Sequence, residues 1–464
     1  MVGTSITAVS APGKVLLAGG YLVLDRDFTG LVFGLDARIH VCIEKLKTTN
    51  GVDLQEIIVK SPQFVGAVWE YGYRSTENNG GVEVTQLRVS SQDKLLRNPF
   101  VETTLSYALT YISTLTTGAI SPASITILAD NSYYTTDSTL KDQSNNQKFS
   151  SFGVKLSEAH KTGLGSSAAL VSSLTGALLL HYLPSDKFSL DNDLGKSRLH
   201  NLAQAAHCAA QGKVGSGFDV ASAVYGSCLY RRFSPSLLQN HGSPGSSNFA
   251  KDLKSLIEET TASHKWDTEI LKDAVKVPSG IRLIMCDVDC GSQTPGMVKK
   301  VLEWRKREPD EAEMLWSQLH SKNEALAAEL KRLAEEAENT DYTKLKQAIT
   351  DIRILIRDMS RLSDVPIEPT PQMALLDACS EIGGVIGGVV PGAGGYDAIA
   401  LLVEDKKSVI SNVQKLISTW KVEAYKDGEG GPSIGKVSLL AVREEMEGIR
   451  VENVQDASYE KWIV

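Results

Sequence analysis

Residues 161–170 read KTGLGSSAAL, and they carry the strongest fold signal in the chain. Two glycines and two serines come directly before an alanine-rich segment, residues 166–183, whose composition predicts a buried helix. The first backbone N–H groups of a helix have no partner inside it, and the helix dipole makes that end positive. The stretch therefore predicts a cradle for a phosphate or another anion. The residues of this candidate cradle are Lys161, Gly163, Leu164, Gly165, Ser166, Ser167 and Ala168.

Other interpretations of these residues are open at this point. A glycine-rich turn with an ordinary serine cap explains Gly163–Ser167 about equally well when the segment is taken alone. The spacing also fits the G-x-G-x-x-G/A dinucleotide fingerprint, but that motif needs a buried strand directly before it, and FGVKLSEAHK (152–161) is not one. Residues 430–437 resemble a Walker P-loop, but Val437 stands where that loop needs Ser or Thr.

Two further glycine-rich stretches lie near the two ends of the chain. The first, Ala11–Tyr21 (APGKVLLAGGY), predicts a loop at Ala11–Lys14 that presents Lys14 at the start of a buried strand. That lysine is either solvated at a strand end or directed into a site. The second, Pro391–Asp397 (PGAGGYD), predicts a loop whose glycines let the backbone approach a ligand, although a tight turn between strands explains it as well.

Composition limits the class of protein. The chain has 464 residues, a net charge of −8 and 42% hydrophobic residues, so it can bury large cores in about two or three domains. An acidic chain argues against general nucleic-acid binding, although a local basic pocket can still bind an anionic substrate. No apolar stretch is long enough to span a bilayer, and no secretory signal is visible. Six scattered cysteines predict neither a disulfide framework nor a zinc site, so we expect a reduced, cytoplasmic protein.

The hydrophobic pattern predicts a mixed chain of strands and helices. Short apolar segments predict strands at 52–60, 82–90, 124–129 and 281–289. Helical periodicity or composition predicts helices at 98–117, 166–183, 197–211, 309–338, 341–361 and 371–382. A segment rich in Ser, Gly and Pro at 234–250 predicts a connection between two domains, residues 1–235 and residues 236–464.

Taken together and in this order, APGKVLLAGGY, TGLGSSAA and PGAGGYDA resemble the three motifs of the GHMP kinase superfamily. The resemblance spans nearly the whole chain. It implies a two-domain fold of the α/β and α+β classes. The N-terminal domain would be a ribosomal-protein-like α/β domain and the C-terminal domain a ferredoxin-like one, with ATP and substrate in the cleft between them.

Three longer segments narrow the resemblance to the phosphomevalonate kinases of fungi and plants: residues 209–233, 289–304 and 365–402. This implies ATP-dependent phosphorylation of 5-phosphomevalonate to 5-diphosphomevalonate in the mevalonate pathway, with ATP and Mg²⁺ bound. The alternative is a mevalonate kinase or another GHMP small-molecule kinase. Two rivals come from other classes. One is a non-catalytic sensor, which would be expected to lose Lys14 or Asp219, and the other is a dinucleotide-dependent dehydrogenase.

The resemblance also implies roles for individual residues. The Gly163–Ser167 loop would hold the ATP phosphates, Ser167 would be a Mg²⁺ ligand, and Lys14 would neutralise charge between donor and acceptor. Asp219 matches the family's catalytic aspartate, with a helix cap as the alternative. Because the acceptor phosphate is already largely ionised at pH 7, we expect Asp219 mainly to orient Lys14. The implied substrate-binding residues are Gly19, Tyr21, Ser216, Gly217, Ser222, Arg231, Gly392, Ala393 and Gly394.

Six other residues are weaker candidates. Arg232 is an alternative to Arg231, and if both lie on a strand only one can face the cleft. Residues 292–294 (SQT) could close over the substrate. His200 and His207 are seven residues apart on one helical face, and we expect both to be structural histidines.

Overall fold

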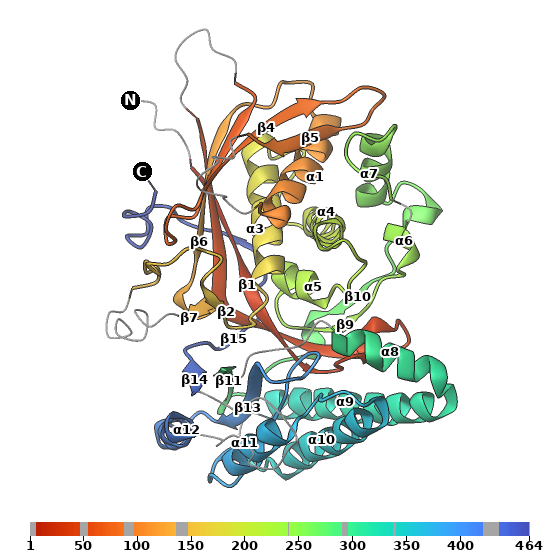
Figure 1. Ribbon diagram of the computed structural model, residues 1–464, viewed down its shortest axis with the longest axis vertical. Helices are drawn as coiled ribbons and strands as arrows, with labels where there is room; N and C mark the ends of the chain where they lie inside the picture. Colours follow the sequence, from red (N-terminus) through yellow and green to blue (C-terminus); the bar gives the residue numbers. More distant parts are fainter. Residues whose placement is uncertain are drawn as a thin grey trace.

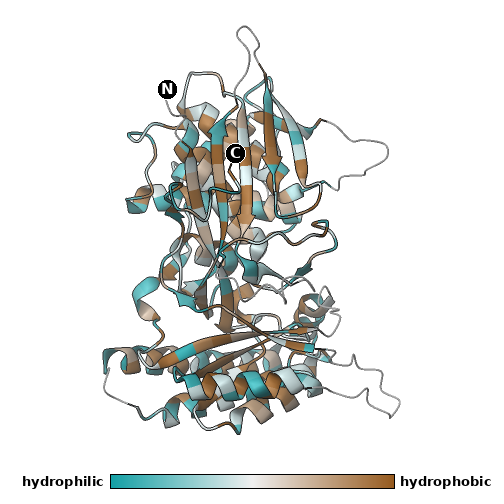
Figure 2. Ribbon diagram, turned by 90° about the vertical axis from the view of Figure 1, so that its left-hand side faces the viewer, coloured by the Kyte–Doolittle hydropathy of each residue, from teal (hydrophilic) through white to brown (hydrophobic). Residues whose placement is uncertain are grey.

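The computed structural model describes residues 6–46, 54–87, 97–135, 147–239, 241–289, 296–336, 340–420 and 436–463. Two lobes are stacked along the long axis of the molecule, and each contains its own sheet (Figure 1). Within the described residues, the upper lobe holds a ten-stranded sheet and the lower lobe a four-stranded one. The apolar residues lie along the strands and on the inner faces of the helices (Figure 2), so each sheet has one helix-covered side.

Strands β1 (Thr7–Ala18) and β2 (Thr29–Lys45) form the antiparallel centre of the upper sheet. β2 is long enough to serve two neighbours, since β9 (Cys228–Arg231) pairs with its first residues and β6 (Ala123–Ala129) with its last. The prediction of a loop at Ala11–Lys14 is wrong, because these residues pair with β2. The Pro-Gly pair instead produces a register shift between Pro12 and Gly13, and irregular points of this kind tolerate proline in a strand.

The upper sheet extends to both sides of this centre. Beyond β6 lie β3 (Glu56–Lys60), β4 (Val68–Ser75) and β5 (Val82–Gln86), and beyond β9 lies β10 (Glu269–Leu271). β3 runs parallel to β6, whereas β4 and β5 continue antiparallel. The strand predicted at 124–129 is confirmed, and those predicted at 52–60 and 82–90 contain β3 and β5, with residues 52–53 and 88–90 outside the described residues. β4 was not predicted, although its residues alternate between buried and partly exposed.

Helices cover one face of the upper sheet (Figure 1): α1 (Pro99–Leu115), α3 (Ser166–Tyr182), α4 (Asp193–Gln211) and α5 (Phe218–Tyr225). α1 begins as its sequence predicts, because the Asn98 side chain accepts a hydrogen bond from the Val101 N–H and proline follows at the first position. α3 packs against both central strands and against the other three helices, which explains its small and apolar composition. α7 (Phe249–Glu258) packs outside α1 and α4.

Short elements connect these parts. They are η1 (Leu22–Leu24), η2 (Asn131–Tyr133), the hairpin of β7 (Tyr134–Thr135) and β8 (His160–Lys161), α6 (Ser236–Gln239), η3 (Ala262–His264) and η4 (Lys272–Ala274).

The lower lobe is an antiparallel sheet with helices packed beneath it. Its strand order is β12 (Val385–Val389), β13 (Ala398–Glu404), β11 (Ile281–Asp289) and β14 (Lys436–Leu440). The helices are α8 (Met297–Arg307), α9 (Pro309–Glu335), α10 (Thr343–Ser363), α11 (Thr370–Ser380) and α12 (Lys407–Thr419). α8 lies at the junction with the upper lobe (Figure 1).

The chain returns to the upper sheet after β14. β15 (Glu444–Glu445) pairs with β2, and β16 (Arg450–Val451) pairs with β1. Two buried side chains of β2 hold this return: Arg38 donates to the Gly448 carbonyl, and the ring Nδ1 of His40 lies 2.8 Å from the Tyr459 hydroxyl. The upper sheet is thus not confined to residues 1–235, and a domain boundary at 235/236 stays a prediction.

Candidate active site

The Gly163–Ser167 loop is held open by two left-handed glycines. Gly163 and Gly165 have φ values of +73° and +82°, a conformation that glycine adopts without strain. Between them Leu164 is buried, and its carbonyl accepts a hydrogen bond of 2.9 Å from the Lys14 backbone N–H. The loop is therefore anchored to β1. No side chain caps the start of α3, so its first N–H groups face the loop without a side-chain acceptor.

Lys14 lies directly under this loop. Its ammonium is 3.4 Å from the Gly163 carbonyl and 5.6 Å from the centre of the Phe218 ring. Its side chain packs so closely on Gly165 that a Cβ there would lie 2.9 Å from the lysine Cε. Burial lowers the pKa of Lys14 below its usual value, and the carboxylate of Asp219 acts in the opposite direction by favouring the charged form. The Lys14 side chain is thus packed between the loop and the Phe218 ring, and its place in a binding site stays a prediction.

Asp219 lies in the first turn of α5. Gly217 precedes that helix with φ +87°, and a Cβ on it would lie 2.6 Å from the Tyr230 hydroxyl. Asp219 Oδ1 accepts a hydrogen bond of 3.0 Å from the N–H of Val220, and Oδ2 lies 3.8 Å from His207 Nε2. One oxygen therefore supports the start of α5 and the other lies near His207, while a catalytic role for Asp219 stays a prediction.

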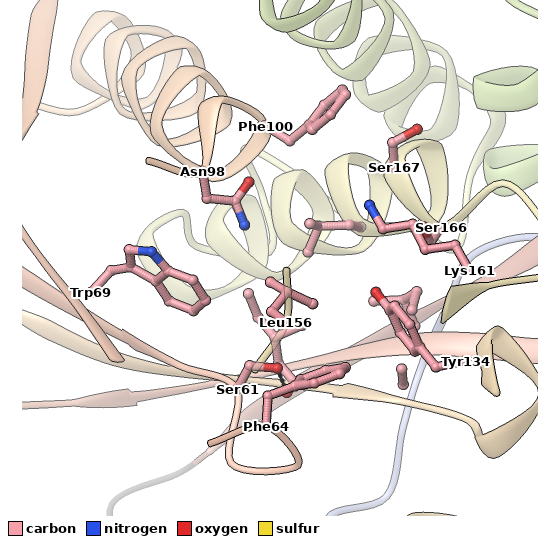
Figure 3. Close-up of a pocket in the computed structure, with 14 residues that line it drawn as sticks. Ser61, Phe64, Trp69, Asn98, Phe100, Tyr134, Leu156, Lys161, Ser166 and Ser167 are labelled. Atoms are coloured by element: carbon pink, nitrogen blue, oxygen red, sulfur yellow. Dashed lines mark hydrogen bonds between the residues drawn. The ribbon is translucent and has the colours of Figure 1, made fainter. Parts of the chain in front are cut away.

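An apolar pocket opens beside the loop (Figure 3). It encloses about 610 Å³, including its open mouth. Phe64, Trp69, Phe100, Leu156 and Leu170 form its apolar wall, and Lys161, Ser166 and Ser167 form its polar end. Asn98 also lines it, and since its Oδ1 is occupied by the cap of α1, its amide nitrogen is the atom directed into the space. The walls come from segments far apart in sequence, which is why sequence reasoning missed this pocket.

The glycine-rich stretch Pro391–Asp397 contacts the stretch Ala11–Tyr21 at the junction of the two lobes. The Tyr21 hydroxyl donates a 2.7 Å hydrogen bond to the Ala393 carbonyl, and the Gly392 N–H donates to the Leu16 carbonyl at 3.1 Å. Gly20 lies so close to the Gly392 carbonyl that no side chain fits there. The PGAGGYD loop is therefore docked on the end of β1, on the same strand that carries Lys14.

Known proteins resemble this chain along its whole length. The family description "GHMP kinases N terminal domain" matches residues 140–227. A phosphomevalonate kinase from Gibberella zeae is 53% identical over 460 residues, which cover 98% of each chain. One from Aspergillus fumigatus is 50% identical and covers 99% of each chain. The chain belongs to the phosphomevalonate kinase family of fungi and plants.

The fold agrees with this membership. The phosphomevalonate kinase of Streptococcus pneumoniae, solved with phosphomevalonate and AMPPNP, has a TM-score of 0.56 to this structure at 16% identity, over 93% of this chain and 99% of that one. At that identity the likeness concerns the fold alone. The α/β two-domain GHMP kinase fold expected from the sequence is confirmed.

The two adjacent arginines of this phosphomevalonate kinase family member already have partners. Arg231 pairs with Glu269 at 3.0 Å and donates to the carbonyls of Arg26 and Asp27. Arg232 donates to the carbonyls of Leu24 (2.6 Å), Val214 (3.0 Å) and Gly215 (2.7 Å). Substrate contact by Arg231 stays a prediction, and Arg232 serves to join two loops.

The other predicted substrate residues lie in different surroundings. The Ser216 carbonyl accepts a hydrogen bond of 2.7 Å from Tyr230, and Ser222 is fully buried within α5. Gly19 and Gly394 have positive φ and pack on neighbouring backbone, so each acts through its conformation. Lys161 is exposed on β8 at the pocket rim. Residues 292–294 lie outside the described residues.

The described part of the chain was also searched for metal-ligand groups and membrane-spanning helices. It contains no group of three or more His, Cys, Asp or Glu side chains suited to a metal ion. None of its helices combines the length and apolarity needed to cross a bilayer. His207 was expected to be structural, but its ring lies between Ser167 and Asp219. No sequence signal distinguishes it from His200 on the same helix.

Proposed function

We propose that the chain transfers the γ-phosphoryl group of ATP to the phosphate of 5-phosphomevalonate, giving ADP and 5-diphosphomevalonate in the mevalonate pathway to isoprenoids and sterols. One observation carries this proposal. The Gly163–Ser167 loop, Lys14 and Asp219 converge on one point, in a chain whose relatives over nearly the full length are phosphomevalonate kinases.

The donor nucleotide fits the loop and the adjoining pocket. The free N–H groups at the start of α3 and the positive end of the helix dipole suit the triphosphate. The apolar wall with Trp69 and Phe100 suits a flat purine, and the Asn98 amide can donate to a ring nitrogen. This arrangement leaves the terminal phosphate near Ser167 and Lys14. The cradle residues Lys161 to Ala168 are proposed on this basis.

Transfer is an in-line displacement at phosphorus. An oxygen of the acceptor phosphate forms a bond to the γ-phosphorus while the bond to the ADP oxygen breaks. Negative charge crowds between donor and acceptor, so a fixed cation there lowers the barrier. Lys14 fits this role, because the loop carbonyl and the Phe218 ring hold it from two sides and Asp219 favours its charged form.

Asp219 has no proton to remove in this reaction. The acceptor is a phosphate monoester with a second pKa of about 6, so it is mostly a dianion at neutral pH. We therefore propose that Asp219 orients Lys14 and favours its charged form, and that it is not a general base. A mevalonate kinase, whose acceptor is an alcohol, would need the base.

Mg²⁺ is the proposed metal cofactor. The ion prefers oxygen ligands and usually keeps several waters or phosphate oxygens, so it does not need a protein cage. The Ser167 hydroxyl and the Asp219 carboxylate, both within 4 Å of His207 Nε2, are the oxygen donors that fit. When bound, Mg²⁺ would neutralise phosphate charge.

The acceptor site is proposed where the glycine-rich stretches Ala11–Tyr21 and Pro391–Asp397 meet. Its residues are Gly19, Tyr21, Ser216, Gly217, Ser222, Arg231, Gly392, Ala393 and Gly394. The Tyr21–Ala393 hydrogen bond and the close contact of Gly20 with Gly392 support a shared binding surface there. The buried state of Ser222 makes it the residue whose direct contact has least support. We also propose a cytoplasmic location, which the five free cysteines of the described chain support.

The test is ADP release from ATP and Mg²⁺ by the purified protein, with phosphomevalonate and with mevalonate in parallel. Release with phosphomevalonate alone is the expected result. Release with mevalonate alone would move the chain to the alcohol kinases. No ADP release with either acceptor, in folded protein that still binds ATP, would refute the proposed substrate. Cell fractionation of tagged protein tests the location.

A further inference from the structure

A buried histidine joins the two oxygen donors of the site. His207, on α4, is only 2% exposed, and its Nε2 lies 3.2 Å from the Ser167 hydroxyl and 3.8 Å from Asp219 Oδ2. The side-chain amide of Gln211, one turn further on, approaches the same nitrogen at 3.4 Å. One ring atom therefore contacts the starts of two helices, α3 and α5, that carry different parts of the site.

The ring is also fixed from its face. Phe100 stacks on His207 with ring centres 5.6 Å apart and planes at 29°. Phe100 also lines the apolar pocket, at the same end as Ser167 (Figure 3). The imidazole is thus clamped between the pocket wall and the two polar groups, which leaves it no alternative rotamer without disturbing one of them.

A second histidine of the same helix provides the contrast. His200 is 3% exposed, and its polar contact is the Asn201 side chain at 3.3 Å, with Tyr225 and Trp266 against its ring. Both histidines are therefore buried to the same degree and seven residues apart. Only His207 contacts residues of the proposed site.

We propose that His207 is a positioning residue that sets the Ser167 hydroxyl, beside the Asp219 carboxylate, in the arrangement that Mg²⁺-bound nucleotide requires. The inference rests on the proposed function and deepens it. In the tautomer that carries its hydrogen on Nδ1, Nε2 accepts the Ser167 hydroxyl hydrogen. The lone pairs of the serine oxygen then face the nucleotide phosphates and their cation rather than the helix.

The experiment compares four variants of the full chain: His207→Leu, His207→Gln, His207→Asn and the control His200→Leu. The readouts are kcat, the Kd of AMPPNP with and without Mg²⁺, and the Tm. His207→Leu preserves apolar packing but removes the hydrogen bonds. We expect its kcat to fall by about 100-fold, as expected for misplaced reacting groups. We also expect the Mg²⁺-dependent tightening of AMPPNP binding to be lost, at a Tm close to that of His200→Leu.

The conservative variants separate positioning from packing. The glutamine amide reaches the place of Nε2, so His207→Gln should recover at least about tenfold of the lost kcat, since the hydrogen bond to the Ser167 hydroxyl is restored. The asparagine amide is shorter and should behave like leucine. If His207→Leu does not fold, the glutamine and asparagine pair carries the test.

Three results would overturn the inference. One is a kcat of His207→Leu equal to that of His200→Leu. Another is Mg²⁺-dependent AMPPNP binding that matches the wild type. The third is equal activity of the glutamine and asparagine variants. If the wild type itself releases no ADP with phosphomevalonate, the proposed function fails instead, and the AMPPNP titrations still decide the role of His207.

Discussion

Replacing Arg232 by methionine should loosen two loops at once. The guanidinium donates to the Leu24 carbonyl, which lies just after the Gly19–Tyr21 turn, and to the carbonyls of Val214 and Gly215, which precede Asp219. Arg232 is only 8% exposed, so water cannot easily replace these bonds. Methionine keeps the apolar stem and its packing but leaves all three carbonyls without this donor.

The expected loss of stability follows from these contacts. A hydrogen bond from a charged group contributes about 1.5–3 kcal/mol, and removing the buried charge recovers part of the sum because its desolvation is no longer required. We expect a net loss of about 4 kcal/mol for Arg232→Met. The entropy of unfolding for 464 residues is about 1 kcal/mol per kelvin, so the Tm should fall by about 4 °C.

The neighbouring arginine is the matched control. Arg231 has a side chain that is 27% exposed, so water can replace its bonds to Glu269 and to the carbonyls of Arg26 and Asp27. Arg231→Met should therefore cost about 1 kcal/mol and lower the Tm by about 1 °C. Both proteins are melted by differential scanning fluorimetry and assayed for ADP release. We expect kcat/KM to fall by about tenfold for Arg232→Met, because the acceptor turn and the Asp219 loop lose their common support. Equal Tm shifts for the two variants would refute this reasoning. A large KM increase for Arg231→Met at unchanged Tm would support the proposed place of Arg231 in the acceptor site.

Three other predictions concern the site and the pH. Lys14→Met should lower kcat by at least about 1,000-fold at nearly unchanged ATP affinity, and residual activity above a tenth of wild type would contradict its assigned role. Tyr21→Phe removes the hydrogen bond to Ala393 and should raise the KM for phosphomevalonate several-fold without changing the KM for ATP; a parallel increase in both would speak against an acceptor-side role. Burial lowers the pKa of His200 and of His241 to about 4, whereas the unfolded chain binds these protons below pH 6.5. The contribution of these two histidines to the free energy of unfolding is therefore fully present above pH 6.5 and decreases as the pH approaches 4, by about 2 kcal/mol per histidine at pH 5. The His200→Leu variant should show a flatter dependence of Tm on pH than the wild type, and an unchanged slope would contradict this assignment.

Local signals predicted much of the framework. The Asn98-Pro99 pair marked the start of α1, and the glycines and serines after residue 162 marked the start of α3, because caps and left-handed glycines are properties of a few consecutive residues. The Pro-Gly pair at Pro12 misled the same reasoning. A proline usually ends a strand, but here the pairing with β2 on one side carries the strand through it by a shift of register.

The parts that the sequence did not reveal depend on distant contacts. The charge of Arg231 and Arg232 is visible in the sequence, whereas the carbonyls that accept their hydrogen bonds come from loops around residues 24 and 214. His207 and His200 have the same spacing and the same burial. Only the folded structure shows which one approaches Ser167. Tertiary hydrogen bonds of this kind have no local pattern, so single-sequence reasoning cannot assign them.

The return of the chain to the upper sheet has a consequence for biosynthesis. A ribosome makes the chain from its N-terminus, and domains usually fold as units while synthesis proceeds. Here β1 obtains its second partner strand at Val9 and Ser10, beside β2, only when Arg450 and Val451 have been made. The buried Arg38 and His40 also wait for Gly448 and Tyr459.

The sheet of the upper lobe therefore stays incomplete while the lower lobe is being translated. A nascent or prematurely terminated chain displays an open strand edge and two buried polar groups without their partners, which are features that chaperones and proteases act on. Only a chain translated past Arg450 and Val451 can cover that edge.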